Sequence, residues 1–317
     1  MKRVLITGGL GFAGGRIARR LAADYKVIVS SRTQPGAGML ALHHDPGYIN
    51  HSELLEKKHF PEGIDTVIHM AALNERDCLS RPSEAVQVNI DQTRIILDNA
   101  ISGGVSRFFY FSTAHIYGSP LQGLINESTL PAPQHPYAIT HRAAEDYVVA
   151  ATRQNKIDGK VLRLSNSFGA PVSASVNRWT LLANDLAKQA VEKRSVSLVS
   201  NGCQFRDFIT LEDVENAVFQ MLAVDASKFP DLIYNLGSGR SMRVIDMAER
   251  IISNYNELFG HTISIRLPQN AVPAAEPLLT YSNEQLLAAG IHLSNDVDKE
   301  LKNLLKFCSE NFKYMPV

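Results

Sequence analysis

Short apolar runs alternate with longer stretches of helical periodicity through the first half of the chain. The apolar runs predict strands at residues 3–7, 26–30, 66–70, 107–112 and 160–164. Between them, apolar residues at helical spacing predict helices at 13–23, 83–102 and 137–154. Because strands and helices that alternate in this way form parallel crossover units, we expect an α/β fold with a doubly wound parallel sheet.

The pattern changes near Phe168, where the apolar runs become shorter and turn signals more frequent. These signals are Asn201-Gly202, Gly237-Ser238-Gly239 and the segment from Pro268 to Pro277. We therefore expect a main domain at 1–167 and a smaller α+β lobe at 168–317, with some later segments returning to the main sheet. Near the C-terminus, an amphipathic helix at 299–306 should dock on the core through Leu301, Leu304 and Leu305.

Composition and charge indicate which partners and which cellular location the protein is expected to have. Lys and Arg number 32, as do Asp and Glu, so the formal net charge is zero and nothing global attracts nucleic acid or an anionic membrane. No apolar run approaches the ~20 residues of a membrane span, and the first residues are too polar for a signal peptide. The three cysteines are widely spaced. We expect a cytoplasmic protein without disulfides.

One group of histidines resembles a metal patch. His43, His44, Asp45 and His51 lie close in sequence, but no helical or turn spacing fixes them as ligands. We expect a solvated loop and no metal site.

A glycine motif directly follows the first expected strand and opens the first helix. In Thr7-Gly8-Gly9-Leu10-Gly11-Phe12-Ala13-Gly14, Gly8 allows a tight turn, Gly11 a close approach of backbone amides to a pyrophosphate, and Gly14 close packing of helix on strand. The helix N-terminus favours the same anion. The sequence therefore predicts a Rossmann-type domain that binds a dinucleotide through Gly8, Gly11, Phe12, Ala13 and Gly14.

The end of the second strand bears on the choice of dinucleotide. A carboxylate there hydrogen-bonds the ribose of NAD, whereas an arginine accommodates the 2′-phosphate of NADP. The strand runs into Ser31 and Arg32 without an acid, and Asp24 lies at its other end. We expect NADP to be preferred to NAD, through Ser31 and Arg32 with Arg16 as a further candidate. The alternative is that Arg32 is only a solvated loop charge.

Further motifs, taken with their order and spacing, resemble the extended short-chain dehydrogenase/reductase family, in its branch that acts on nucleotide-diphosphate sugars. The resemblance covers essentially the whole chain. Its motifs are His69-Met70-Ala71-Ala72, Asn89, Phe111-Ser112-Thr113-Ala114-His115-Ile116-Tyr117-Gly118, Tyr137, Arg163-Leu164-Ser165-Asn166-Ser167-Phe168-Gly169, Gly202-Cys203-Gln204-Phe205-Arg206-Asp207-Phe208-Ile209 and Tyr234-Asn235-Leu236-Gly237.

The resemblance implies roles for individual residues. Thr113 would hydrogen-bond the reacting oxygen and Tyr137 would exchange a proton with it, while Asn166 and Arg206 would grip the substrate diphosphate. The cofactor would also meet Ala71, Ala72, Asn89, Tyr137 and His141. For Arg206 an ion pair with Asp207 or Asp213 remains the alternative.

Two further expectations concern Trp179 and the assembly, and the second of them comes from the resemblance. Trp179 either faces the sugar or base of the substrate, or packs the smaller lobe. The helices at 83–102 and 137–154 would form a homodimer interface, as the corresponding pair does in the family.

The chain departs from the family's Tyr-x-x-x-Lys pair, because His141 stands where the lysine is expected. The spacing still places both side chains on one helical face. The lysine lowers the tyrosine pKa and holds the nicotinamide ribose, whereas histidine carries little charge at neutral pH and reaches less far. Pro136 should place Tyr137 in the first helical turn, where the helix dipole favours a phenolate.

A second departure concerns the type of reaction. The family's 4,6-dehydratases carry an Asp-Glu pair after the catalytic Thr, whereas this chain has Ala114-His115. Because elimination of water needs an acid and a base, we do not expect a 4,6-dehydratase. His115 either moves a proton on the substrate or is hydrogen-bonded in the pocket wall.

The resemblance, taken with these residues, implies an NAD(P)-dependent enzyme that acts at C4 of a nucleotide-diphosphate sugar, either as a 4-epimerase or as a 4-keto reductase. The strand end that suits NADP favours the reductase. The competing hypothesis is a protein that binds NAD(P) and a nucleotide sugar but has lost catalysis through the change to His141.

Overall fold

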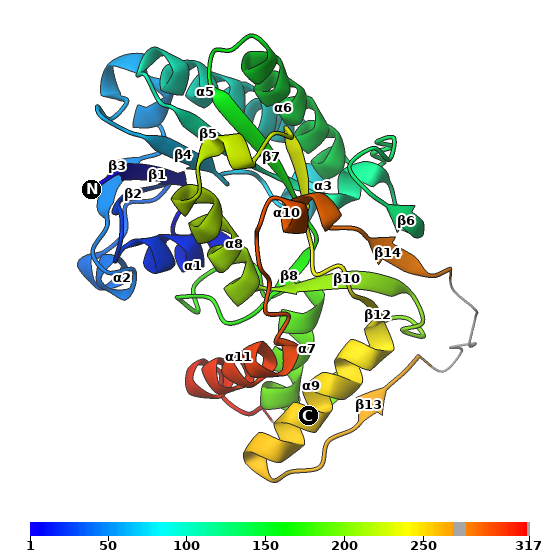
Figure 1. The fold of residues 1–317 in the computed structure, drawn as a ribbon. Coiled ribbons are helices and arrows are strands. Elements are labelled where there is room, and N and C mark those ends of the chain that lie inside the picture. Colours follow the sequence, from blue (N-terminus) through cyan, green and yellow to red (C-terminus); the bar gives the residue numbers. More distant parts are fainter. Residues whose placement is uncertain (269–276, 316–317) are drawn as a thin grey trace.

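A seven-stranded parallel sheet forms the centre of the computed structural model, which describes residues 1–268 and 277–315 (Figure 1). Its order is β11-β7-β5-β4-β1-β2-β3. The bounds are β1 Arg3–Thr7, β2 Lys26–Ser31, β3 Gly47–Asn50, β4 Thr66–His69, β5 Arg107–Thr113, β7 Asp158–Leu164 and β11 Ile233–Leu236. Because the strand order reverses between β1 and β4, the sheet is doubly wound, as predicted, and its switch point lies at the carboxyl ends of these strands.

The five strands expected from the apolar runs are β1, β2, β4, β5 and β7. The sequence pattern missed β3 and β11, which are four residues long each. Turn segment 268–277 lies almost entirely outside the described residues.

Helices cover both faces of the sheet. α1 (Phe12–Leu21) and α8 (Leu211–Ala223) cover one face, while α5 (Thr93–Ser102) and α6 (Pro136–Arg153) cover the other (Figure 1). The helix expected at 83–102 is instead α4 (Pro82–Val86), a π-helical segment Gln87–Gln92 and α5. α6 begins at Pro136, so Tyr137 lies in its first turn as predicted.

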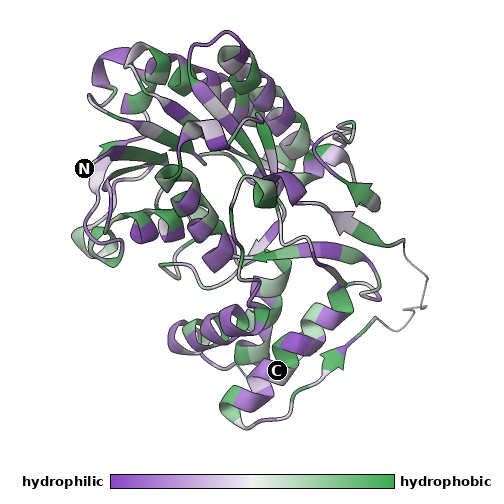
Figure 2. Ribbon diagram, in the orientation of Figure 1, coloured by the Kyte–Doolittle hydropathy of each residue, from purple (hydrophilic) through white to green (hydrophobic). Residues whose placement is uncertain are grey.

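Side-chain burial explains this arrangement. Strand residues alternate between the two faces, so that Val4 and Ile6 pack with Ile17 and Leu21 of α1, whereas Leu5 packs on the opposite side. The helices are striped with hydrophilic and hydrophobic residues (Figure 2). Burial of these stripes on the sheet is the main apolar contribution to the fold.

A smaller lobe is built from three packed helices and short strands. The helices are α7 (Leu182–Lys193), α9 (Val244–Phe259) and α11 (Val297–Asn311), and Leu301, Leu304 and Leu305 are fully buried as expected. The other short strands of the chain are β6 Gly123–Ile125, β8 Asn166–Phe168, β9 Val196–Ser197, β10 Phe205–Thr210, β12 Ser241–Arg243, β13 Ile265–Arg266 and β14 Leu279–Tyr281. The other short helices, in either part of the chain, are α2 Ala37–Leu42, α3 Glu75–Ser80 and α10 Glu284–Ala288. After β10, α8 packs on α1 and β11 joins the main sheet.

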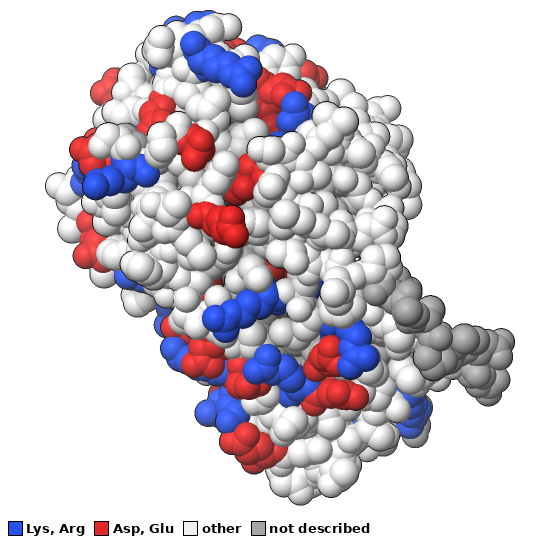
Figure 3. All heavy atoms as spheres, turned by 45° about the vertical axis from the view of Figure 1, so that its right-hand side comes forward, with Lys and Arg blue, Asp and Glu red and all other residues white. Residues whose placement is uncertain are grey.

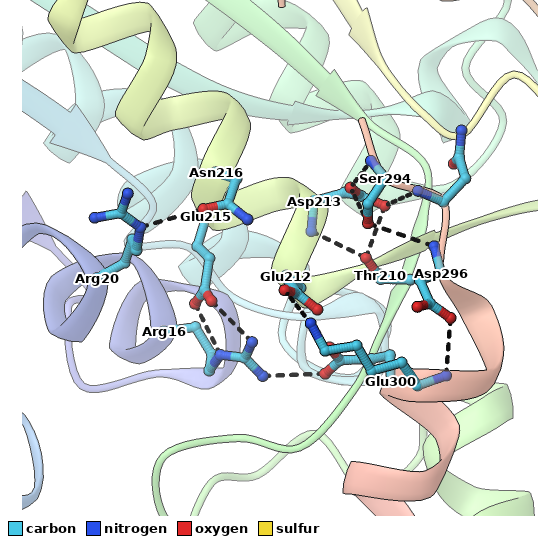
Figure 4. Close-up of polar contacts among 12 residues, drawn as sticks. Arg16, Arg20, Thr210, Glu212, Asp213, Glu215, Asn216, Ser294, Asp296 and Glu300 are labelled. Atoms are coloured by element: carbon cyan, nitrogen blue, oxygen red, sulfur yellow. Dashed lines mark hydrogen bonds and ion pairs between the residues drawn. The ribbon is translucent and has the colours of Figure 1, made fainter. Parts of the chain in front are cut away.

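An ionic cluster joins the main sheet to the smaller lobe (Figure 4). Arg16 of α1 contacts Glu215 of α8 at 2.8 Å and Glu300 of α11 at 3.0 Å. Burial opposes the charge on Arg16, but hydrogen bonds to Glu215 and the charge of Glu300 outweigh it and raise the Arg16 pKa. Arg16 does not line the cavity described below, and Glu215 and Glu300 hold its guanidinium, so the structure gives no support to its suggested contribution to NADP binding.

Charged side chains of both signs lie beside each other on the surface, without a large area of one sign in the view of Figure 3. Among the described helices, none is long and apolar enough to cross a bilayer. The described part of the chain also contains no group of three or more His, Cys, Asp or Glu arranged to hold a metal ion.

Candidate active site

A cavity of about 810 Å³ opens at the switch point of the sheet. Residues that follow the carboxyl ends of β1, β2, β4 and β5 line it, together with the start of α6. Since β2 and β5 lie on opposite sides of β1 and β4 in the sheet, the cavity crosses from the loop after Ser31 to Tyr137 and His141. Gly8, Gly11, Phe12, Ala13, Gly14, Ala71 and Ala72 line it between these ends.

The glycine loop is shaped for a ligand that approaches the backbone. Gly8 has a φ of +68°, which glycine adopts without strain. A Cβ on Gly14 would overlap the carbonyl oxygen of Gly8. Gly11 is the N-cap residue of α1, and no side chain accepts a hydrogen bond from the first amides of this helix. These amides are therefore available to an anion.

Buried hydroxyls and a histidine hold the cavity wall after β4. Thr93 donates to the carbonyl of Asn89 at 2.8 Å, so its oxygen must accept the 2.9 Å hydrogen bond from His69 Nε2. His69 Nδ1 then accepts from the Thr7 hydroxyl at 2.8 Å. The same Thr7 oxygen accepts the amides of Met70 and Ala71, which fixes the backbone beside the cavity.

At the β2 end, Ser31 and Arg32 both line the cavity. Arg32 is exposed and makes no ion pair or hydrogen bond with the described residues. The neighbouring lining residues from Thr33 to Gly36 include no acid. This end of the cavity therefore offers a free guanidinium and no carboxylate.

Tyr137 and His141 meet at the other end of the cavity, where their ring centroids are 4.4 Å apart. Burial raises the pKa of Tyr137 well above its ordinary value, and the charge of Glu75 adds to this rise. The neighbouring side chain of Thr113 acts in the opposite direction. The phenol is therefore protonated at neutral pH.

His141 is 3 % exposed and lines the cavity. Burial lowers its pKa to about 4, so the imidazole is neutral at physiological pH. Its Nδ1 lies 2.7 Å from the hydroxyl of Tyr110, whereas its Nε2 is buried with no partner among the described residues. His141 thus supplies no cation to lower the pKa of Tyr137.

An ion pair lies close to these rings. Glu75, at the start of α3, contacts Arg178 of the loop after β8 at 2.7 Å. Burial alone would raise the Glu75 pKa, but the hydrogen bond and charge of Arg178 lower it to about 2. Glu75 is therefore ionised at neutral pH.

A smaller cavity of about 230 Å³ shares Ser167 and Leu181 with the larger one. His115, Asn166 and Arg206 line it. Asn166 donates to the carbonyl of Asp207 at 2.9 Å, whereas the guanidinium of Arg206 has no ion pair or hydrogen bond with the described residues. Burial lowers the Arg206 pKa, which means that the guanidinium is desolvated without a counter-ion.

Two of the residues expected to contact a ligand, Asn89 and Trp179, line neither cavity. Asn89 is buried and lines neither cavity, because its side chain accepts from the Leu73 amide and donates to Thr140 and Cys78. Trp179 lines neither cavity either: it packs on Phe307 and Phe312 and donates to the carbonyl of Ala174. Asn89 therefore shapes the wall from behind, and Trp179 belongs to the smaller lobe's core.

Three residues near the site, Tyr110, Glu75 and Arg178, were not predicted from the sequence. Tyr110 lies within an apolar strand and has the pattern of a core residue. Glu75 precedes a short helix and Arg178 lies in a loop, so no periodicity joins these two residues, which are far apart in sequence.

Known proteins resemble this chain in sequence and in fold. A sequence model described as the NAD dependent epimerase/dehydratase family matches residues 4–237. The chain is 29% identical over 272 residues to a dTDP-D-glucose 4,6-dehydratase of Mus musculus, covering 81% of this chain and 74% of that protein.

Two solved structures share the fold. UDP-glucuronic acid 4-epimerase from Bacillus cereus, in complex with UDP-glucuronic acid and NAD, is 20% identical with a TM-score of 0.78 and covers 98% of this chain and 100% of its own. RMD from Pseudomonas aeruginosa, complexed with NADPH, is 20% identical with a TM-score of 0.75 and the same coverage.

Proposed function

Because the chain belongs to the NAD dependent epimerase/dehydratase family, we propose that it oxidises or reduces C4 of a nucleotide-diphosphate sugar with a nicotinamide dinucleotide. The observation that carries this proposal is the contact of Tyr137 and His141, with Thr113 near Tyr137, at the end of a cavity that shares two lining residues with a second one. The larger cavity would take the dinucleotide and the smaller one the nucleotide sugar.

The residues of the larger cavity fit a dinucleotide. The uncapped N-terminus of α1 and the glycine loop suit its diphosphate. At the far end, the unpartnered Nε2 of His141 offers one hydrogen bond to a ligand. When bound, the nicotinamide supplies reversible hydride transfer at the sugar carbon.

The protein's own side chains would handle the proton. Thr113 would orient the oxygen on C4, and the Tyr137 hydroxyl would exchange a proton with it. Since burial keeps Tyr137 protonated and His141 neutral, the phenol is better prepared to donate a proton than to accept one. This state favours reduction of a 4-keto sugar over oxidation of a 4-hydroxyl.

Elimination of water is less well supported, although relatives of the chain include 4,6-dehydratases. The Asp-Glu pair of such enzymes is replaced here by Ala114-His115. Glu75 is a nearby carboxylate, but its ion pair with Arg178 holds it deprotonated and occupied. Glu75 is therefore not in the protonated form that would be needed to donate a proton to a leaving hydroxyl.

Arg206 and Asn166 would bind the diphosphate of the substrate. The desolvated guanidinium of Arg206 lacks a protein counter-ion, and a diphosphate would supply that charge. His115 is exposed in the same wall, where it is placed to face the sugar.

We also propose NADP as the preferred cofactor and a homodimer as the assembly. Arg32 is free and exposed at the β2 end, and a structural relative is complexed with NADPH. For the dimer, four large hydrophobic side chains are exposed on α3, α4 and α6, namely Leu79, Val86, Ile139 and Tyr147. Light scattering at micromolar concentration should give twice the 35.0 kDa mass of one chain, and a 35.0 kDa particle would contradict the dimer.

A panel of nucleotide sugars and 4-keto sugars, each incubated with NADPH or NADH and followed by mass spectrometry, tests the reaction. We expect NADPH-dependent reduction of a 4-keto sugar. The neutral His141 favours one other candidate, a binding protein without catalysis. Binding of cofactor and nucleotide sugar with no product across the panel would support that candidate instead.

A further inference from the structure

Tyr110 of β5 lies between two buried histidines. Its ring centroid is 5.9 Å from that of His69 on β4 and 5.8 Å from that of His141 on α6. Tyr110 is 2 % exposed, so its hydroxyl requires a partner within the protein.

His69 is not that partner. Both of its ring nitrogens are occupied, Nδ1 by the hydroxyl of Thr7 and Nε2 by that of Thr93. The described hydrogen bond of the Tyr110 hydroxyl is the one to His141 Nδ1, at 2.7 Å.

Which of the two groups donates in the hydrogen bond between Tyr110 and His141 follows from where their hydrogens can lie. Burial, with the charge of Glu145 as the next cause, raises the Tyr110 pKa well above its ordinary value, so the phenol keeps its hydrogen. If His141 Nδ1 donated, that hydrogen would have no acceptor among the described residues. The hydroxyl therefore donates to Nδ1, and the ring hydrogen of neutral His141 lies on Nε2.

The Nε2 hydrogen has no acceptor in the described protein. The atom is buried, and His141 lines the dinucleotide cavity beside Tyr137. A neutral N–H suits a neutral oxygen, such as a sugar hydroxyl, whereas a phosphate would be bound more strongly by a cation.

We propose that Tyr110 is a positioning residue that holds His141 in the Nε2–H tautomer, and that this N–H donates to a hydroxyl oxygen of the cofactor's ribose next to the nicotinamide. The identity of the acceptor rests on the proposed function, whereas the tautomer does not. On this account, histidine replaces lysine as a neutral donor that is oriented by a second side chain.

NMR of protein labelled with ¹⁵N in histidine tests the tautomer in the wild-type protein. The His141 signals are assigned by their absence from the spectrum of His141→Gln. Long-range ¹H–¹⁵N correlations should show Nε2 protonated and Nδ1 unprotonated at neutral pH. A proton on Nδ1, or on both nitrogens, would overturn the proposal whether or not the protein is an enzyme.

Binding measurements test the role toward the cofactor. Tyr110→Phe should weaken NADPH binding by about 3- to 10-fold, the scale of one hydrogen bond. It should leave binding of adenosine 2′,5′-diphosphate unchanged, because that ligand lacks the nicotinamide ribose. Tyr234→Phe is the matched control: Tyr234 is fully buried and accepts a hydrogen bond from the Asp231 amide away from the cavity, and its loss should affect neither ligand.

The outcomes separate this proposal from the proposed function. NADPH affinity that is equal in wild type and Tyr110→Phe would refute the positioning role even if turnover is found. A wild-type protein that binds no nicotinamide cofactor would refute the proposed function and the ribose contact, while the NMR result would still decide the tautomer.

Discussion

Arg206 and Asp207 are neighbours on β10, yet their side chains serve opposite faces of the strand and do not pair. The Asp207 carboxylate accepts hydrogen bonds from Ser165 and Ser238 at 2.5 and 2.7 Å, whereas Arg206 lines the smaller cavity. The alternation of side chains along a strand produces this separation. It leaves Arg206 as a partly buried cation whose counter-ion would come from a ligand.

Arg206→Met should therefore have opposite effects on stability and binding. Removal of a desolvated, unpaired guanidinium should raise the Tm of the ligand-free protein. The affinity for a nucleotide-diphosphate sugar should fall by about 10-fold or more, since a charge-assisted contact is lost, with NADPH affinity unchanged. Thermal unfolding and calorimetric titration measure both. A lower Tm together with unchanged sugar-nucleotide affinity would show that Arg206 has a structural role only.

The free guanidinium of Arg32 predicts cofactor preference. NADPH should bind more tightly than NADH, and Arg32→Ala should remove the difference, a loss of about 1.5–3 kcal/mol for a charge-assisted contact. Arg19→Ala, which removes another exposed arginine outside the cavity, is the control and should keep the preference. NADH bound as tightly as NADPH by the wild-type protein would contradict this interpretation.

Tyr137→Phe should lower turnover by about 100-fold or more, because it removes the group that exchanges the proton. Affinity for cofactor and substrate should change little, since the ring and its contact with His141 remain. Single-turnover kinetics with separate binding titrations check both points. Retained turnover would exclude Tyr137 as the acid.

His141→Lys places a cation beside Tyr137 and should lower the pKa of the phenol by stabilising the phenolate. Tyr137 must be protonated to donate a proton. As the pH rises, activity should therefore be lost at a lower pH in the variant than in the wild type. The variant should also be less stable, because the Tyr110 hydroxyl loses its acceptor and the ammonium is desolvated. The pH profile of kcat/KM and the Tm measure these effects. An unshifted basic limb would show that residue 141 does not control the Tyr137 pKa.

Local sequence was sufficient to predict much of the fold and the strand, glycine turn and helix that follow β1. The strand, glycine turn and helix around Gly8 are adjacent in sequence. The role of each glycine depends on its position between the strand and the helix. The π-helical segment at 87–92 was not foreseen, since apolar residues at helical spacing look alike in one helix and in two pieces joined by a π turn.

Contacts between distant segments could not be predicted. The pairing of Glu75 with Arg178 and of Tyr110 with His141 depends on how loops and helices dock on the sheet. Trp179 shows the converse: an aromatic residue near a site motif was open to two interpretations, and packing against Phe312 decided between them. Asn89 is similar, because its motif position gave no sign that its amide was already used within the protein.

The central claim is that the protein transfers a hydride to C4 of a 4-keto nucleotide sugar while Tyr137 donates the proton. Incubation of the wild-type protein with 4-keto sugars and NADPH carrying deuterium at the reactive position of the nicotinamide tests it most directly. We predict one deuterium at C4 of the product for each NADP⁺ formed, and loss of this signal in Tyr137→Phe. Binding of both ligands with no deuterium at C4 of any product would contradict the account.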